Sequence, residues 1–175
     1  MSSAYEYEIK VKRMKASGLK NRPIVSLNGG VKVGDVSDLT LDSTNVQLSA
    51  ILLTGHEGNS VVPYPAVRHI GPDAVTIDDS RIVQAPANHG GIEERRTSSL
   101  NGLAVLDEKG TVIGSVDDLE FDEESGRVTA LLIHHGGVMG IGGSHQKIAA
   151  SAIRGIGPEM VTVDLTPVAS LANLN

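Results

Sequence analysis

Residues 110–133 read GTVIGSVDDLEFDEESGRVTALLI, and residues 30–53 read GVKVGDVSDLTLDSTNVQLSAILL. The two stretches align at an offset of 80 residues, with glycine, valine, aspartate and leucine recurring at the same places. Further along, IGPDAVTID (70–78) recurs as IGPEMVTVD (156–164), at an offset of 86. Self-similarity at a fixed period marks an internal repeat. The sequence therefore predicts one structural unit used twice.

Each copy has the pattern of short β-strands. VGDVSDLTLD (33–42) and IGSVDDLEFD (113–122) have short alternating apolar patterns, too short and too β-branched for helices. The Ser-Gly pair within FDEESGRV (121–128) is typical of a hairpin turn. IGPDAVTI predicts a turn followed by a strand, since no central strand would hold its proline. The fold class is therefore predicted to be all-β: two tandem small barrels with little helix.

The copies also predict the domain organisation. Residues 1–84 form the first unit, residues 85–96 a linker of polar, Pro and Gly character, and residues 97–175 the second unit with a short tail. YEYEIKVK (5–12) alternates regularly and predicts an extra half-buried N-terminal strand, at an edge or between the units. The shift in offset means six extra residues in the second copy, within HHGGVMGIGGSHQ (134–146).

The amino-acid composition excludes several classes of functional site and binding partner. The 175 residues include no Cys, which excludes disulfides, thiolate metal sites and a Cys nucleophile. There is no signal peptide or apolar run long enough to span a bilayer, so we expect a cytoplasmic protein. The net charge of −6 argues against broad nucleic-acid binding. Residues 1–25 are the exception, with six Lys/Arg against two Glu, and could attract an anionic partner.

These motifs resemble the PRC-barrel domain: Gly-Xaa-Val-Xaa-Asp-Leu, an acidic hairpin, an apolar strand, a Gly-rich hairpin, and Ile-Gly-Pro before a last strand. Residues 97–165 are the better match, and residues about 16–80 are a more divergent copy. The family includes the cytoplasmic part of the H subunit of photosynthetic reaction centres and a domain of a factor that matures the small ribosomal subunit. The resemblance implies an interaction module and carries no catalytic residues with it.

The Gly-rich stretch 134–146 invites two chemical interpretations. A phosphate cradle is disfavoured, because the Gly-Lys-Ser/Thr ending and a following helix are missing. A transition-metal site at His134, His135 and His145 is disfavoured too, since adjacent strand residues point to opposite faces and the loop has no carboxylate. We expect no bound metal there.

The acidic run 107–124 lacks the calcium-loop pattern, so a solvated face is expected. Asp38 and Asp118 recur before Leu at a strand turn, which favours backbone capping over catalysis. No local motif supports a nucleophile or an acid–base pair, and scarce aromatic residues offer little to line a pocket. We therefore expect no enzyme, no catalytic residues and no cofactor.

The prediction for function is a non-enzymatic adaptor, or a subunit of a larger assembly, that binds a protein partner or self-associates. Exposed apolar residues on a hairpin tip are typical of a contact surface. The candidate partner-binding residues are therefore Val138, Met139 and Ile141 of the Gly-rich hairpin. The alternative is a ribosome- or RNA-associated maturation factor that uses the basic N-terminal segment. Its candidate residues are Lys10, Lys12 and Arg13.

Overall fold

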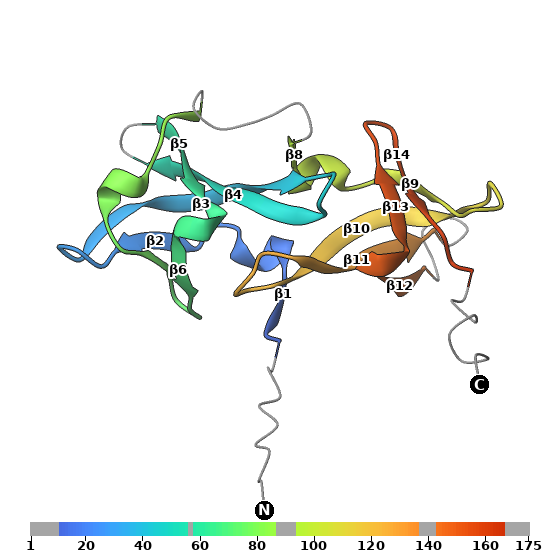
Figure 1. The fold of residues 1–175 in the computed structure, drawn as a ribbon, viewed down its shortest axis with the longest axis horizontal. Helices are drawn as coiled ribbons and strands as arrows, with labels where there is room; N and C mark the ends of the chain where they lie inside the picture. Colours follow the sequence, from blue (N-terminus) through green and yellow to red (C-terminus); the bar gives the residue numbers. More distant parts are fainter. Residues whose placement is uncertain (1–10, 56–57, 87–93, 137–142, 167–175) are drawn as a thin grey trace, which may run out of the picture.

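The computed structural model describes residues 11–55, 58–86, 94–136 and 143–166 (Figure 1). Strands dominate, and the helices are short 3₁₀ turns. The first copy contains β1 (Arg13–Lys15), η1 (Ala16–Leu19), β2 (Pro23–Ser26), β3 (Val31–Asp42), β4 (Gln47–Gly55), β5 (Gly58–Pro63), η2 (Tyr64–Ala66), β6 (Val67–Ile70), β7 (Val75–Ile77) and η3 (Ser80–Ile82). The second contains β8 (Glu94–Arg96), η5 (Thr97–Leu100), β9 (Ala104–Leu106), β10 (Val112–Asp122), β11 (Val128–His135), β12 (Ser144–Ala149), η7 (Ala150–Ala152), β13 (Ile153–Ile156) and β14 (Met160–Val163).

The two sheets have the same topology. The first runs β5-β4-β3-β2-β7-β6, and the second runs β12-β11-β10-β9-β14-β13. All of these neighbours are antiparallel except β2 with β7 and β9 with β14, which are parallel. Each sheet curls into a half-barrel, and the two lie side by side (Figure 1). The prediction of an all-β fold built from two tandem barrels is confirmed.

Each sheet takes its seventh strand from the other copy. β1, at the start of the first copy, pairs with β10, and β8, at the start of the second copy, pairs with β3. Met14 lies opposite Phe121, and Arg95 lies opposite Leu41. The two units are therefore joined by a reciprocal exchange of strands. β8 consists of the last three residues of the segment predicted to be a linker, so part of that segment belongs to a sheet.

The predicted N-terminal strand lies mostly outside the described residues, which begin at Val11. Val11 and Lys12 are exposed and precede β1, so the strand that joins the units begins one residue after the predicted range. Among the described residues, β1 is therefore the N-terminal strand that lies between the two units.

A glycine at the same position of β3 and β10 lets the neighbouring strand approach closely in each unit. Gly34 lies opposite Ile24, and Gly114 opposite Val105. A Cβ atom at Gly34 would lie 2.6 Å from the Thr54 carbonyl oxygen, and one at Gly114 would lie 2.8 Å from that of His134. Such distances are far below van der Waals contact, so both positions require glycine for close approach of the neighbouring strand.

The recurring IGP phrase is the turn that joins the last two strands of each unit. Gly71 donates its N–H to the Ala74 carbonyl, and Gly157 donates to the Met160 carbonyl, both at 2.9 Å. The strand after each turn, β7 or β14, then pairs in parallel with β2 or β9. The phrase recurs because both units use this hairpin to continue the sheet beyond β2 or β9.

The strand registers locate the six extra residues of the second unit. In the first unit Gly55 pairs with Gly58, which leaves residues 56 and 57 between them. In the second unit His135 pairs with Ser144, which leaves the eight residues 136–143 between them. The difference of six lies at the end of the β11–β12 hairpin, inside the predicted range 134–146.

The apolar residues of both units form a single core. Val, Ile and Leu dominate it, and residues such as Leu39, Ile51, Leu119 and Leu131 are almost fully buried. Tyr64 and Phe121 are the aromatic residues of the described core, one from each unit. The core is thus continuous across the boundary between the units.

Candidate functional site

Asp38 clamps the start of η5, an element of the other unit. Its Oδ1 atom accepts hydrogen bonds from the Thr97 hydroxyl at 3.0 Å and from the Ser98 N–H at 3.3 Å. The Ser98 hydroxyl donates to Oδ2 of the same carboxylate. Asp38 also accepts a hydrogen bond from the N–H of Leu39 at 2.8 Å. One carboxylate therefore satisfies donors on both sides of the inter-unit boundary.

Asp118 makes the matching clamp on η1. Its Oδ1 atom accepts a hydrogen bond from the Ser17 N–H at 3.2 Å, and its Oδ2 atom accepts one from the Ser17 hydroxyl. The N–H of Leu119 donates to Oδ1 at 2.8 Å. Ala16 stands where the other clamp has Thr97, so this clamp lacks the second hydroxyl contact.

A local irregularity in each long strand turns these carboxylates toward the boundary. The register of β3 against β4 shifts between Val36 and Asp38, and that of β10 against β11 shifts between Val116 and Asp118. An extra residue of this kind bends a strand and re-aims its side chains. Backbone capping by Asp38 and Asp118 was predicted from the sequence, and the bonds to Leu39 and Leu119 agree with it.

The inter-unit hydroxyls were missed, because they lie 59 or more residues from their acceptors. A sequence signal for them exists. ASGL (16–19) and TSSL (97–100) align at an offset of 81, which places Ser17 over Ser98. Extending the repeat comparison upstream of residue 30 finds this pair.

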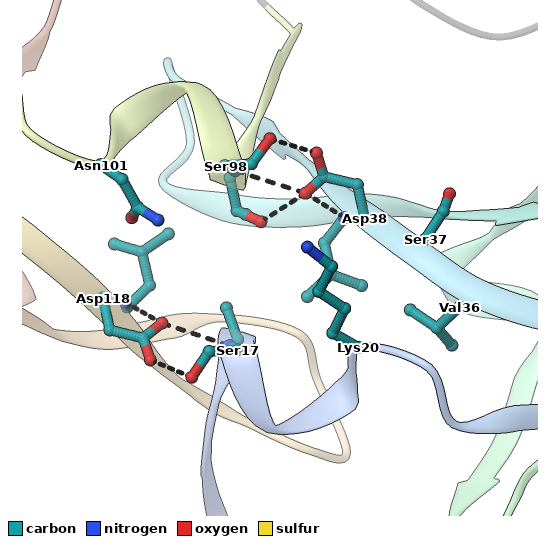
Figure 2. Close-up of a pocket in the computed structure, with 12 residues that line it drawn as sticks. Ser17, Lys20, Val36, Ser37, Asp38, Ser98, Asn101 and Asp118 are labelled. Atoms are coloured by element: carbon teal, nitrogen blue, oxygen red, sulfur yellow. Dashed lines mark hydrogen bonds between the residues drawn. The ribbon is translucent and has the colours of Figure 1, made fainter.

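The two clamps face each other across a cavity of about 100 Å³ (Figure 2). Ser37, Lys20 and Asn101 join them in its lining. Lys20 and Asn101 hold matching places after η1 and η5, so these matching positions of the lining differ in charge. Its carboxylates already accept several hydrogen bonds each, and none of the described residues that line it is a histidine, the usual general base. The arrangement holds the two units together.

Tyr64 makes a second, asymmetric contact across the boundary. Its hydroxyl donates to the Glu123 carbonyl at 2.7 Å, and its ring meets the Phe121 ring edge-on at 6.3 Å. Burial, with the nearby charges of Asp122 and Glu123, raises the pKa of the Tyr64 hydroxyl. The hydroxyl therefore stays protonated and remains a donor.

Glu120 departs from the solvated face predicted for the acidic run. Only 8% of this residue is exposed. Lys147 Nζ lies 2.8 Å from its carboxylate, and the Thr129 hydroxyl donates to it at 3.3 Å. The Lys147 hydrogen bond, opposed by desolvation, lowers the pKa of Glu120 below its ordinary value. The solvated-face prediction is wrong for Glu120 because β11 and β12 bring hydroxyl and ammonium partners to it.

Two cations of the basic N-terminal segment, Lys12 and Arg13, contact carboxylates of the second unit. Lys12 Nζ lies 3.0 Å from Glu123, and Arg13 lies 4.0 Å from Glu120. Lys10, the third candidate, lies outside the described residues. The two described candidates are thus partly neutralised within the chain.

The three histidines considered for a metal lie at the end of the β11–β12 hairpin. His134 and His145 are directly opposite, with ring centroids 4.9 Å apart, while His135 contacts Gln146 at 3.0 Å. His145 also lies 3.6 Å from Asp117. Within the described ranges no three His, Asp or Glu side chains form a group that could hold a metal ion. That no metal binds here stays a prediction.

Val138, Met139 and Ile141, the candidate contact residues, lie outside the described residues. The described part of the chain contains no helix with the length and apolar character needed to cross a membrane.

Comparison with known protein families identifies the family to which this chain belongs. The model of the PRC-barrel domain matches the chain twice, over residues 12–84 and 92–164. No curated protein matches the chain significantly. PRC-barrel domains are a non-catalytic kind of domain and usually mediate protein interactions. With two matches that cover most of its length, and two sheets of one topology, the chain belongs to the PRC-barrel domain family as a tandem of two copies.

Proposed function

We propose that this chain is a non-enzymatic, cytoplasmic adaptor, or a subunit of a larger assembly, and that it binds a protein partner through the β11–β12 hairpin. One observation carries the proposal. Two units of the same topology and register differ by six residues, and those residues enter at the end of that hairpin.

The inter-unit boundary supports this assignment by elimination. The carboxylates and hydroxyls of the two clamps are used to join the units, so these groups offer little to a substrate. An addition at a hairpin end alters the surface without disturbing the packed core. The added segment contains Val138, Met139 and Ile141, and apolar residues with an adaptable Met suit a protein contact.

The RNA-associated alternative receives less support. Lys12 and Arg13 contact Glu123 and Glu120 of the second unit, and Arg22 donates to the carbonyls of Gly71 and Gly18. Stacking platforms for bases need exposed aromatic rings, and the described aromatic residues, Tyr64 and Phe121, are buried.

The test uses the full chain as bait. The Met139→Ser/Ile141→Ser double variant is compared with wild type for partner capture, with quantitative mass spectrometry and cross-linking to locate the contact. A matched control is Leu27→Ser/Val31→Ser, which removes two exposed apolar residues from the first unit (53% and 52% exposed). Loss of the cross-linked partner in the first variant alone supports the proposal.

Two results contradict it. Equal capture by both variants moves the interface away from the hairpin. Binding of RNA with a steep dependence on salt concentration, as expected where Lys and Arg contact phosphates, supports the RNA-associated alternative instead.

A further inference from the structure

The outer edge of β5 in the first unit is covered by the chain itself. After β7 the chain passes through η3 and returns to β5, where Gln84 and Val61 form an isolated antiparallel bridge. Val61 donates its N–H to the Gln84 carbonyl and Gln84 donates to the Val61 carbonyl, both at 2.8 Å. Ile82 and Val83, just before the bridge, pack against the core.

The matching edge in the second unit is β12. Leu52 pairs with Val61, and Leu132 pairs with Lys147, so Lys147 is the counterpart of Val61. Its outward N–H and carbonyl have no backbone partner among the described residues, which stop at Thr166. A row of unpaired backbone groups along a sheet edge is a template for another strand.

The sequence beyond Thr166 continues the repeat. At the offset of 86 that relates the closing phrases, Ile82-Val83-Gln84 aligns with Val168-Ala169-Ser170. Both segments read apolar, apolar, polar. The chain extends to Asn175, so its length is sufficient to reach the position that matches Gln84.

The chain also leaves the last strand of each unit through a turn of the same kind, although the turn lies one residue earlier in the second unit, where Asp164 is the counterpart of Asp78. Asp79 accepts a hydrogen bond from the Arg81 N–H at 2.8 Å. Asp164 accepts one from the Thr166 N–H at 2.9 Å. In the second unit Leu165 is also held, because its N–H donates to Glu108 at 2.9 Å. A carboxylate that bonds the N–H two residues on makes an Asx turn, which sets the direction of the exit.

We propose that residues 168–170 cover the outer edge of β12, with Ser170 opposite Lys147 as Gln84 is opposite Val61. The surface of β12 that faces outward is thus a binding site for an extended segment, and its resident occupant is the tail of the same chain. This inference is independent of the proposed adaptor function.

Amide hydrogen exchange of the full chain tests it, read by NMR at the Lys147 N–H. The comparison is between wild type, a chain that ends at Thr166, and Ser170→Pro, which removes the N–H that would bond Lys147. The Val61 N–H, whose acceptor is known, reports that each variant is folded. Asn173→Pro controls for a proline in the tail away from the bridge.

The expected result is slow exchange at Lys147 in wild type and Asn173→Pro, at least tenfold faster exchange in the other two variants, and no change at Val61. An amide-to-amide Overhauser contact between Lys147 and Ser170 should accompany it. Fast exchange at Lys147 in wild type overturns the proposal. Protection that survives truncation and rises with protein concentration also overturns it, because the occupant is then a second copy.

Discussion

Gln47 and Arg127 hold the same place in the two units, and they pair with each other in an antiparallel bridge. On either side of it, Leu48 donates its N–H to the Gly126 carbonyl at 2.8 Å, and Val128 donates to the Val46 carbonyl at 3.1 Å. A pseudo-twofold axis therefore runs between the units, as in a dimer whose interface joins a patch to its own copy. The strand exchange and the Asp–Ser clamps obey the same symmetry.

The first prediction is that the chain reassembles from two pieces. If it is divided into residues 1–89 and 90–175, we expect the halves to form a 1:1 complex, because each sheet needs the seventh strand that the other half carries. Size-exclusion chromatography with light scattering measures the complex. Halves that begin at Ala16 and Thr97, and so lack β1 and β8, are expected to bind more weakly. Halves that stay monomeric when mixed contradict the prediction.

The second prediction concerns the two clamps. Asp38→Ala leaves donors of Thr97, Ser98 and Leu39 without their acceptor, and should lower the free energy of unfolding by about 1–3 kcal/mol. Asp118→Ala should cost less, because its clamp has no counterpart of the Thr97 hydroxyl. Urea unfolding measures both.

The control for the clamps is Asp35→Ala, which removes an exposed carboxylate that contacts Lys32 at 2.9 Å. A surface pair of this kind contributes about 0–1 kcal/mol. If Asp38→Ala is no more harmful than the control, the clamp does not hold the units together.

The third prediction compares two glycines in turns. Gly126 has φ of 73°, and a Cβ there would lie 2.7 Å from the Tyr64 ring. Gly110 has φ of 80° and open space around it. Gly110→Ala should cost about 1 kcal/mol for the left-handed backbone alone, and Gly126→Ala about 1–3 kcal/mol more for the overlap with the ring. Thermal or urea unfolding gives the difference.

A double mutant isolates the contribution of the Tyr64 ring to the cost of Gly126→Ala. In a Tyr64→Ala background, the extra cost of Gly126→Ala over Gly110→Ala should shrink toward zero. An unchanged difference means that Tyr64 is not the cause. The matching position to Gly126 is Val46, which adopts φ of 52°, and the residue that matches Tyr64 is Ala150. The first unit thus tolerates a side chain at this turn where the facing residue is small.

The fourth prediction is a pH dependence at Glu120. Its pKa is lowered in the folded chain, chiefly by Lys147, so its contribution to stability is complete above the unfolded pKa of about 4.3. That contribution is lost as the pH falls through the lower, folded pKa. Urea midpoints between pH 2 and 7 should therefore fall less steeply on acidification for Glu120→Gln than for wild type.

Lys147→Met should raise the pKa of Glu120 toward its ordinary value and cost about 1 kcal/mol near neutral pH. NMR titration of the Glu120 carboxyl measures the first effect. Glu159→Gln, at an exposed residue of the second unit, controls for the loss of a charge. A Glu120 titration that does not respond to Lys147→Met contradicts the assignment.

Several features of the fold were determined by the sequence alone. The offset of 80 aligned Gly34 with Gly114, and the strand registers agree. Alternation predicted β3 and β10, the Ser-Gly pair predicted the turn at Gly126, and the change of offset located the six extra residues. These features are readable because strand periodicity and turn chemistry depend on neighbours in the chain.

How the two units are joined could be learned only from the tertiary structure. No local pattern states that β1 adds to the sheet of the second copy, or that Ser17 meets a carboxylate 101 residues away. The strand pattern is satisfied equally by pairing within one copy or across two, because a sheet edge offers the same backbone groups to either strand. The burial of Glu120 follows from the same cause, since its partner Lys147 arrives from a neighbouring strand. The sequence thus determined what each unit is, whereas the shared core and the available edges decided how the two units are joined.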